Sequence, residues 1–229
     1  MAETLRLTLA QLNPTLGDLA GNAEKVRAAW AKGRAAGADL VAFPEMFVTG
    51  YNAQDLFMRP GFQHDAIDMV DRLAADCAVG PALAVGAPFV EDGRLYNAYH
   101  VCAGGTVVAR ILKHHLPNDM VFDEKRIFDS GRVTGPFVIG PARLGSPICE
   151  DAWFDDVAET LAETGAEILL VPNGSPYYRG KQEVRLNHMV ARTVETGLPL
   201  VYLNMVGGQD DQVFDGGSFV LNPGGQIVA

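Results

Sequence analysis

The chain is poor in cysteine and in basic residues, and it has no long apolar run. Its 229 residues include only three cysteines, Cys77, Cys102 and Cys149, which lie far apart. This pattern favours reduced thiols in the cytoplasm over a disulfide framework or a zinc site. Acidic residues outnumber basic ones by 28 to 18, and the net charge of −10 argues against nucleic acid as a partner. Because no stretch has the form of a signal peptide or a membrane span, we expect no membrane partner either.

Linkers, repeats and low-complexity tracts are also absent from the sequence, so residues 1–229 are expected to form a single domain. Hydrophobic residues make up 48% of the chain, which also has 25 glycines. This composition is typical of a globular α/β protein with many loops.

Strands and helices are expected to alternate along most of the chain, with helices outside and sheet inside. Residues 39–43 and 82–88 are short apolar runs typical of buried parallel strands. Residues 113–135 and 206–217 are expected to be irregular. Helices are expected at about 18–36, 63–79, 153–163 and 181–196, and the remaining strands at 4–11, 97–103, 106–112, 137–139, 144–148, 167–171, 199–203 and 218–221.

Several chemically active residues follow predicted strands directly: Glu45, Lys113, Cys149 and the segment 173–175. Open α/β sheets bind ligands at the carboxyl ends of their strands. These residues can therefore meet in one site although they are distant in sequence.

Cys149 follows the apolar run 144–148 and precedes a helix-like pattern that opens at Trp153. The N-terminus of a helix carries partial positive charge, which stabilises a thiolate and makes the cysteine nucleophilic. The alternative is a buried cysteine that acts as a small hydrophobic residue. The local sequence leaves both interpretations open.

A nucleophilic thiol also needs a base and a group that stabilises negative charge. Glu45 is the better candidate for the base, since partial burial after an apolar strand would raise its pKa toward neutrality. The pair His114 and His115 is an alternative base, and Lys113 is the natural cation. The competing interpretation of Glu45 and Lys113 is an ordinary surface residue.

Six stretches resemble motifs of one family. Residues 43–45 (Phe-Pro-Glu), 113–118 (Lys-His-His-Leu-Pro-Asn) and 148–153 (Ile-Cys-Glu-Asp-Ala-Trp) are similar to the glutamate, lysine and cysteine motifs of the nitrilase (carbon–nitrogen hydrolase) superfamily. Residues 121–126, 175–181 and 206–218 resemble, more narrowly, the glutaminase domain of bacterial glutamine-dependent NAD synthetases. Together they cover almost the whole chain.

The resemblance implies a four-layer α-β-β-α sandwich that hydrolyses the side-chain amide of glutamine. It makes Glu45 the general base, Lys113 the oxyanion ligand, Cys149 the nucleophile that forms a thioester, and Glu124 a support that orients the lysine. From the residues alone, Glu124 is a surface acid in a charged loop. The glutaminase reaction needs no cofactor or metal, whereas the partner synthetase domain would use ATP and Mg to amidate deamido-NAD with the ammonia. Members of the family also commonly form homo-oligomers.

The same matching implies contacts to a free amino acid, whose ammonium and carboxylate require opposite charges in the pocket. Glu150 corresponds to the acid that binds the ammonium, and Ser175 and Lys181 hold the amino acid backbone. The alternative for Lys181 is the first turn of a solvated helix. Asp119 replaces a tyrosine that lines the glutamine pocket in the family, so it adds negative charge there.

Four further interpretations remain open. The ATP-binding loop of the synthetase half has no counterpart in the sequence, which indicates a fragment that lacks its C-terminal end and the synthetase domain. A stand-alone amidase or nitrilase-type hydrolase of another small amide is the main alternative. A cysteine–histidine hydrolase and a non-catalytic scaffold are the others.

Overall fold

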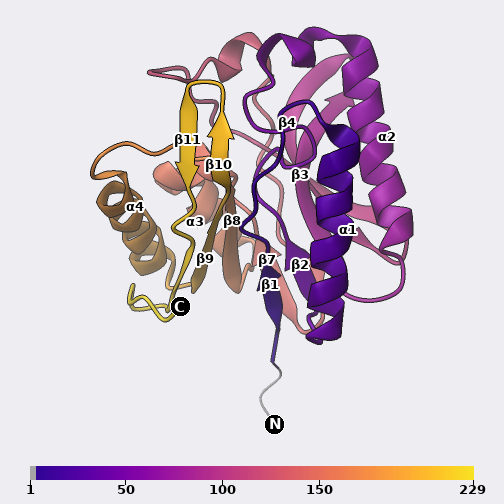
Figure 1. Cartoon of the computed structure of the whole chain (residues 1–229). Coiled ribbons are helices and arrows are strands. Elements are labelled where there is room, and N and C mark those ends of the chain that lie inside the picture. Colours follow the sequence, from indigo (N-terminus) through magenta and orange to yellow (C-terminus); the bar gives the residue numbers. More distant parts are fainter. Residues whose placement is uncertain (1–3) are drawn as a thin grey trace.

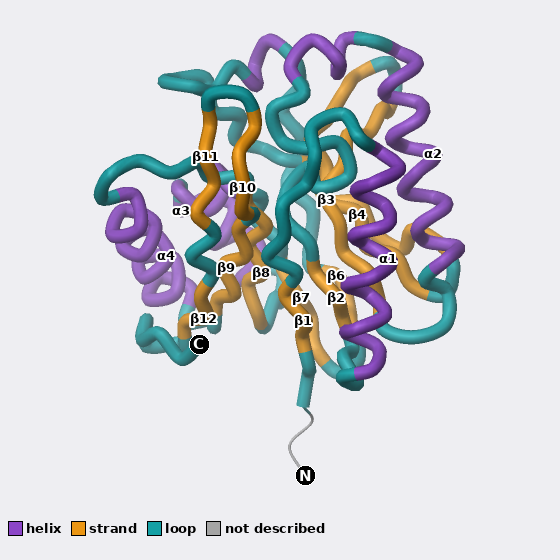
Figure 2. The backbone as a smooth tube through the Cα atoms, in the orientation of Figure 1, coloured by secondary structure: helices purple, strands orange, loops and turns teal. Residues whose placement is uncertain are grey.

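A computed structural model describes residues 4–229 as two five-stranded sheets packed face to face, with helices on both outer sides (Figures 1 and 2). The helices are α1 (Leu19–Ala35), α2 (Pro60–Asp76), α3 (Asp155–Glu163) and α4 (Lys181–Thr196), with 3-10 helices η1 (Gln54–Met58), η2 (Glu124–Arg126) and η3 (Cys149–Trp153). The expected four-layer α-β-β-α sandwich is confirmed.

The two sheets mix parallel and antiparallel pairs. In the first, β1 (Leu7–Leu9), β2 (Leu40–Ala42) and β3 (Ala82–Glu91) are parallel, and β4 (Arg94–Ala103) and β5 (Thr106–Leu112) continue as an antiparallel meander. In the second, β7 (Ala142–Gly145), β8 (Ile168–Asn173) and β9 (Leu200–Asn204) are parallel, and antiparallel β6 (Phe137–Ile139) and β12 (Phe219–Leu221) form the edges.

The apolar strands contribute to different cores on their two faces. In β2, Val41 packs with Trp30 of α1 and Leu73 of α2. Its neighbours Leu40 and Ala42 belong to the core between the sheets. Because successive side chains point to opposite faces, a strand covered on both sides must be apolar throughout. A third core joins α3 and α4 to the second sheet.

The segment around the cysteine differs from the prediction. The strand expected at 144–148 is β7, which ends at Gly145, and the helix expected to open at Trp153 is α3, which begins at Asp155. Pro147 has no N–H to continue a ladder, so the chain leaves the sheet before the cysteine. Cys149 therefore begins the one-turn η3 and not the N-terminus of an α-helix.

The segment 206–217, expected to be a loop, contains the hairpin β10 (Val206–Gln209) and β11 (Gln212–Asp215). The strands could not be recognised in this glycine-rich sequence, since glycine has low strand propensity. The hairpin stands beside β9 and rises above the second sheet (Figure 1). The side-chain oxygen of Gln209 in β10 accepts the N–H of Tyr51 at 2.9 Å, so the hairpin is hydrogen-bonded to the loop after β2.

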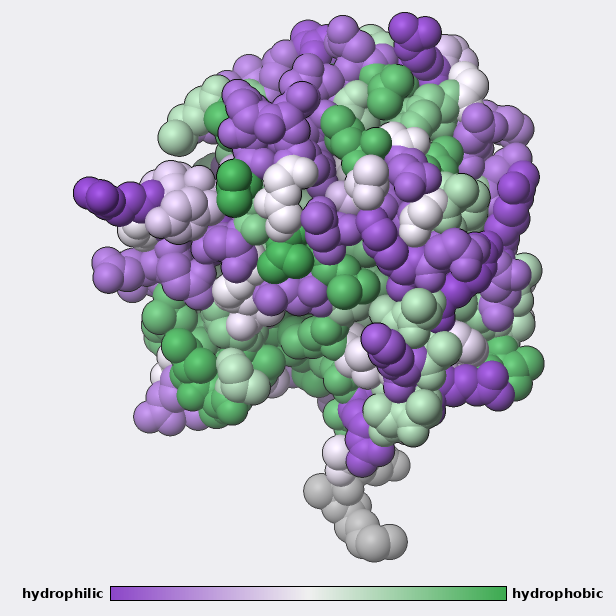
Figure 3. Space-filling view, in the orientation of Figure 1, coloured by the Kyte–Doolittle hydropathy of each residue, from purple (hydrophilic) through white to green (hydrophobic). Residues whose placement is uncertain are grey.

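The face shown in Figure 3 alternates polar and apolar residues, with an apolar area near the C-terminus. The exposed apolar side chains of the last residues are Ile227 and Val228. Within residues 4–229, no helix combines the length and the hydrophobicity needed to cross a bilayer.

Candidate active site

Glu45 lies where the chain leaves β2, pressed against the backbone of β3. Phe43 still donates its N–H to the carbonyl of Ala84 at 2.8 Å, and the chain then turns. A Cβ at Gly86 would lie 2.1 Å from the nitrogen of Met46 and 2.8 Å from the Cα of Glu45. Only glycine permits this close approach. Glu45 is fully buried, so the surface-acid interpretation is wrong.

Lys113 directly follows β5 and is also fully buried, which rules out the surface-lysine interpretation. Its Nζ donates to Oε1 of Glu45 at 2.7 Å and to Oε1 of Glu124 at 2.8 Å. Asn97 of β4 donates from Nδ2 to the same Glu45 oxygen at 2.8 Å, and Gly174 donates its N–H to Oε2 at 2.8 Å. The ends of strands from both sheets thus meet at one carboxylate, as the sequence predicts.

Glu124 occupies η2 in the stretch expected to be irregular. Its exposed fraction is only 6%, so the interpretation as a surface acid is wrong. Its Oε1 also accepts the hydroxyl of Tyr51 at 2.6 Å, whereas Oε2 is buried without a partner among residues 4–229. The prediction did not include Tyr51. The ring of Tyr51 lies so close to Gly174 that a Cβ there would be 2.6 Å from it.

The buried charges shift one another's pKa. Burial alone would lower the pKa of Lys113, but the charges of Glu124 and Glu45 outweigh it and hold the pKa well above its usual value. Lys113 is therefore an ammonium. Burial raises the pKa of Glu124 to about 7, and Lys113 opposes that rise. A carboxyl that titrates near neutrality beside a permanent cation is typical of a functional site.

Cys149 is buried, with a positive φ of 48°. A residue with a side chain pays on the order of 1 kcal/mol for a left-handed conformation, and such strain gathers at functional sites. Burial first, and then the charge of Glu45, raise the pKa of Cys149 well above its usual value, although Lys113 lowers it. Of the two interpretations left open by the local sequence, the thiolate at a helix N-terminus does not fit this burial, and Cys149 rests as a thiol.

Asp151 ties the segment after β5 to the segment before η3. Its Oδ1 accepts the N–H groups of His114 at 3.0 Å and His115 at 2.7 Å, and its Oδ2 accepts that of Ile148 at 3.0 Å. His114 directly follows the site lysine, and Ile148 directly precedes the site cysteine. Burial raises the pKa of Asp151 to about 6, against the effect of these hydrogen bonds. Asp151 was missed, although it lies inside the cysteine motif.

Ser175 and Lys181 lie at the two ends of the loop between β8 and α4. The Oγ of Ser175 accepts from Nε of Arg185 at 3.1 Å, and its hydroxyl also faces the phenol oxygen of Tyr202. Lys181 is the first residue of α4, yet its exposed fraction is only 8%, so the solvated-helix interpretation is wrong. Its Nζ lies 4.0 Å from the ring centroid of Trp153 and 4.9 Å from that of Tyr178. Burial lowers the pKa of Lys181.

Glu150 and Asp119 line a cavity of about 680 Å³ that opens toward solvent. Burial raises the pKa of Glu150, Lys113 opposes the rise, and Asp119 adds to it. Lys181 lines a different cavity of about 230 Å³, beside Tyr178. The predicted substrate residues thus lie in two hollows near the cysteine, while Ser175 is enclosed by Arg185.

The two histidines offered as alternative bases point elsewhere. Nδ1 of His114 lies 2.7 Å from the carbonyl of Gly131, and Nε2 of His115 lies 2.8 Å from a carboxylate oxygen of Asp156. These partners speak against a cysteine–histidine hydrolase.

Two sheets stacked between helix layers, with an acid, a lysine and a cysteine at neighbouring strand ends, define a hydrolase of the nitrilase type. The carbon–nitrogen hydrolase family model matches residues 6–229, and the chain belongs to this family.

Known relatives extend well beyond the matched region. The glutamine-dependent NAD(+) synthetase of Rhodobacter capsulatus is 61% identical over 228 residues, which are 100% of this chain and 41% of that protein. The synthetase of Thermotoga maritima is 37% identical over 228 residues, 98% of this chain and 39% of that protein. The chain therefore spans about two fifths of the length of these relatives.

Solved structures show the same fold. The glutamine-dependent NAD+ synthetase of Acinetobacter baumannii, in complex with ADP, has a TM-score of 0.92 and 35% identity, covering 99% of this chain and 43% of that one. An amidase variant from Nesterenkonia sp. AN1, with acrylamide added at its active-site cysteine, has a TM-score of 0.86 and 27% identity, covering 98% of this chain and 88% of that one.

Proposed function

We propose that this chain hydrolyses the side-chain amide of glutamine to glutamate and ammonia, for use by a synthetase domain that amidates deamido-NAD. The observation that carries the proposal is the buried ammonium of Lys113, held between the carboxylates of Glu45 and Glu124 beside Cys149. Similarity to synthetases named for their dependence on glutamine supports the choice of amide.

The geometry around Glu45 suits a general base. Its Oε1 is occupied by Lys113 and Asn97, whereas Oε2 accepts, among residues 4–229, only the N–H of Gly174 and keeps a lone pair. Because Cys149 rests as a thiol, its proton must leave as the sulfur attacks the amide carbon. Glu45 takes that proton, and the oxyanion of the tetrahedral intermediate accepts a hydrogen bond from Lys113.

The intermediate collapses when the carbon–nitrogen bond breaks and Glu45 passes its proton to the departing ammonia. The acyl group remains on Cys149 as a thioester. Water then attacks the thioester, Glu45 takes a proton from it, and this proton returns to the sulfur as glutamate leaves. Every proton is accounted for by Glu45, so the reaction needs no cofactor or metal. ATP and Mg would serve only the synthetase domain.

We assign the substrate's ends by charge. Glu150, with Asp119 nearby, binds the α-ammonium, while Lys181, assisted by Ser175, binds the α-carboxylate. The aromatic rings around Lys181 limit its motion and leave its charge available. A cytoplasmic homo-oligomer remains our expectation for the complete protein.

The test follows the acyl-enzyme by mass spectrometry after brief mixing with glutamine and an acid quench. We expect an adduct of the γ-glutamyl group on Cys149, and loss of ammonia release in Cys149→Ala. Cys77→Ala and Cys102→Ala are matched controls, because both thiols are buried in the core and neither lies in the site. Full activity of Cys149→Ala would refute the thioester.

A substrate panel tests the choice of glutamine. Glutamine should be hydrolysed faster than propionamide or butyramide, which lack the α-ammonium. A preference for these simple amides would favour the stand-alone amidase instead. Each measurement is repeated with the synthetase portion of a relative added, so that low activity of the chain alone is distinguished from a wrong substrate.

A further inference from the structure

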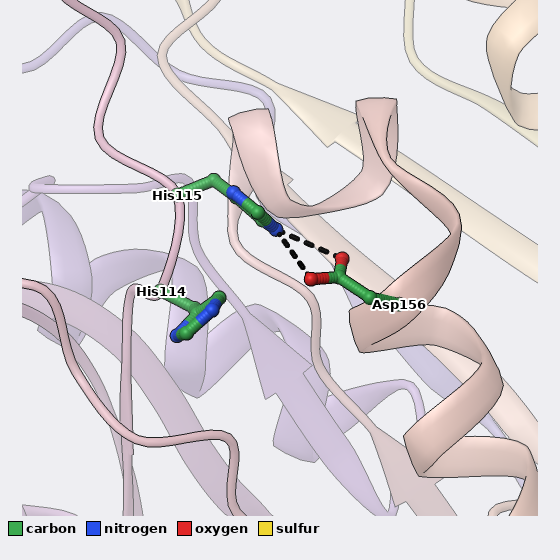
Figure 4. A group of neighbouring side chains, drawn as sticks. All are labelled: His114, His115 and Asp156. Atoms are coloured by element: carbon green, nitrogen blue, oxygen red, sulfur yellow. Dashed lines mark hydrogen bonds and ion pairs between the residues drawn. The ribbon is translucent and has the colours of Figure 1, made fainter.

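The strongest cluster of potential metal ligands outside the proposed catalytic groups is formed by His114, His115 and Asp156 (Figure 4). The histidines come from the segment after β5, and the aspartate comes from the first turn of α3. One ligand atom from each residue lies within 4.8 Å of the others. We propose that these three side chains form a binding site for Zn²⁺ or a similar borderline cation.

The hydrogen bonds fix the histidines in a form that can bind a metal. Nδ1 of His114 lies 2.7 Å from the carbonyl of Gly131, and because a carbonyl only accepts, this nitrogen carries the hydrogen. In the neutral ring Nε2 then keeps its lone pair. A ring N–H donated to a backbone carbonyl is the usual second contact of a metal-bound histidine.

His115 and Asp156 already converge. Nε2 of His115 lies 2.8 and 3.0 Å from the two carboxylate oxygens of Asp156, with Phe154 packed 4.3 Å from the imidazole centroid. Tetrahedral zinc holds its ligand atoms about 3.4 Å apart, given bonds of about 2.0–2.1 Å. The widest separation in the cluster must therefore close by at most about 1.4 Å, which side-chain rotation can supply.

The surroundings favour a cation. The two histidines form part of the wall of the cavity of about 680 Å³, whose charged lining consists of Asp119, Asp129 and Glu150 against Lys125. This excess of acid raises the local concentration of cations. The cavity also gives water access to the open fourth position of a three-ligand zinc site.

The ligand backbone is pre-organised as well. Asp151 holds the N–H groups of both histidines, and Ser130 donates its hydroxyl to the carbonyl of His114. Two nitrogen ligands and one carboxylate suit zinc better than Mg²⁺ or Ca²⁺, which prefer oxygen ligands throughout. A bound ion would join the segment after Lys113 to α3.

The test is calorimetric titration of the chain with Zn²⁺ in a Cys149→Ser background, which removes the site thiol as a competing ligand. We expect one ion per chain, and a loss of affinity of about tenfold or more in His115→Ala and in Asp156→Asn. His64→Ala is the matched control. His64 forms a similar pair with Asp68 on α2 but lacks a third ligand, so its loss should change nothing.

Three results would overturn the site: no zinc binding, which would leave an ion pair only; an affinity unchanged by His115→Ala and Asp156→Asn; or an equal loss in His64→Ala. Asp156 is exposed and makes no core contact, so Asp156→Asn should keep the fold. Titration with Mg²⁺ completes the comparison, and equal affinity for Mg²⁺ would contradict the borderline-cation assignment.

Discussion

Replacing Glu124 by glutamine should change how stability depends on pH. Burial raises the pKa of Glu124 from 4.5 to about 7, so the folded chain holds this proton more tightly than the unfolded chain. Stability from this group is therefore greatest below pH 4.5 and falls as the pH rises through about 7. Glutamine has nearly the same shape and does not titrate.

The two pKa values give the size of the effect. They differ by about 2.5 (7 − 4.5). At about 1.4 kcal/mol per pH unit the whole change is about 3 kcal/mol, most of which falls between pH 5 and pH 8. Over this interval the free energy of unfolding of the wild type should fall by about 2–3 kcal/mol more than that of Glu124→Gln.

Urea-induced unfolding at constant ionic strength, followed by tryptophan fluorescence, measures this difference. Asp123→Asn is the matched control, since Asp123 is the exposed acid next in sequence and pairs with Arg126 at the surface. Its pH profile should follow that of the wild type. If the curves for wild type and Glu124→Gln stayed parallel within about 0.5 kcal/mol, the buried titration of Glu124 would be refuted. Hydrolysis by Glu124→Gln should fall, because Lys113 loses one of its two anionic partners.

Three further substitutions test the supporting structure. Asp151→Asn should lower the free energy of unfolding by about 2–4 kcal/mol and kcat by about 100-fold. The reason is that an amide has one accepting oxygen, whereas both carboxylate oxygens of Asp151 accept backbone N–H groups. An unchanged urea midpoint would contradict this. Gly86→Ala should displace Glu45 and abolish hydrolysis. Gly61→Ala is the control, because a Cβ there meets nothing within 4 Å, and it should keep its activity. Equal activities of the two variants would show that the close approach of Gly86 to Glu45 is unimportant. Lys181→Met should raise KM for glutamine more than it lowers kcat, and the reverse pattern would remove Lys181 from ground-state binding.

Much of the fold was predictable because periodic segments carry their own signal. The apolar runs of β2 and β8 and the helix beginning at Lys181 were recognised from local pattern alone. The convergence of Glu45 with Lys113 also followed from the sequence, since both come directly after strands and strand ends gather at one edge. Motif resemblance, not periodicity, identified Glu124.

Irregular segments carried no such signal, and the errors lie there. The residues alone made Glu124 a surface acid, and its burial results from Tyr51 and Lys113, which approach from distant parts of the chain. The protonation of Cys149 was left open by the local sequence for the same reason, because it depends on burial and on the charge of Glu45.

The sequence by itself determined the α-helices and most strands, apart from the hairpin of β10 and β11, and the order of the reactive residues along them. The tertiary structure alone decided which acids lost water and which backbone groups Asp151 would hold together. Desolvation and charge interactions depend on distances in space, and sequence separation does not encode these distances where segments meet without periodic structure.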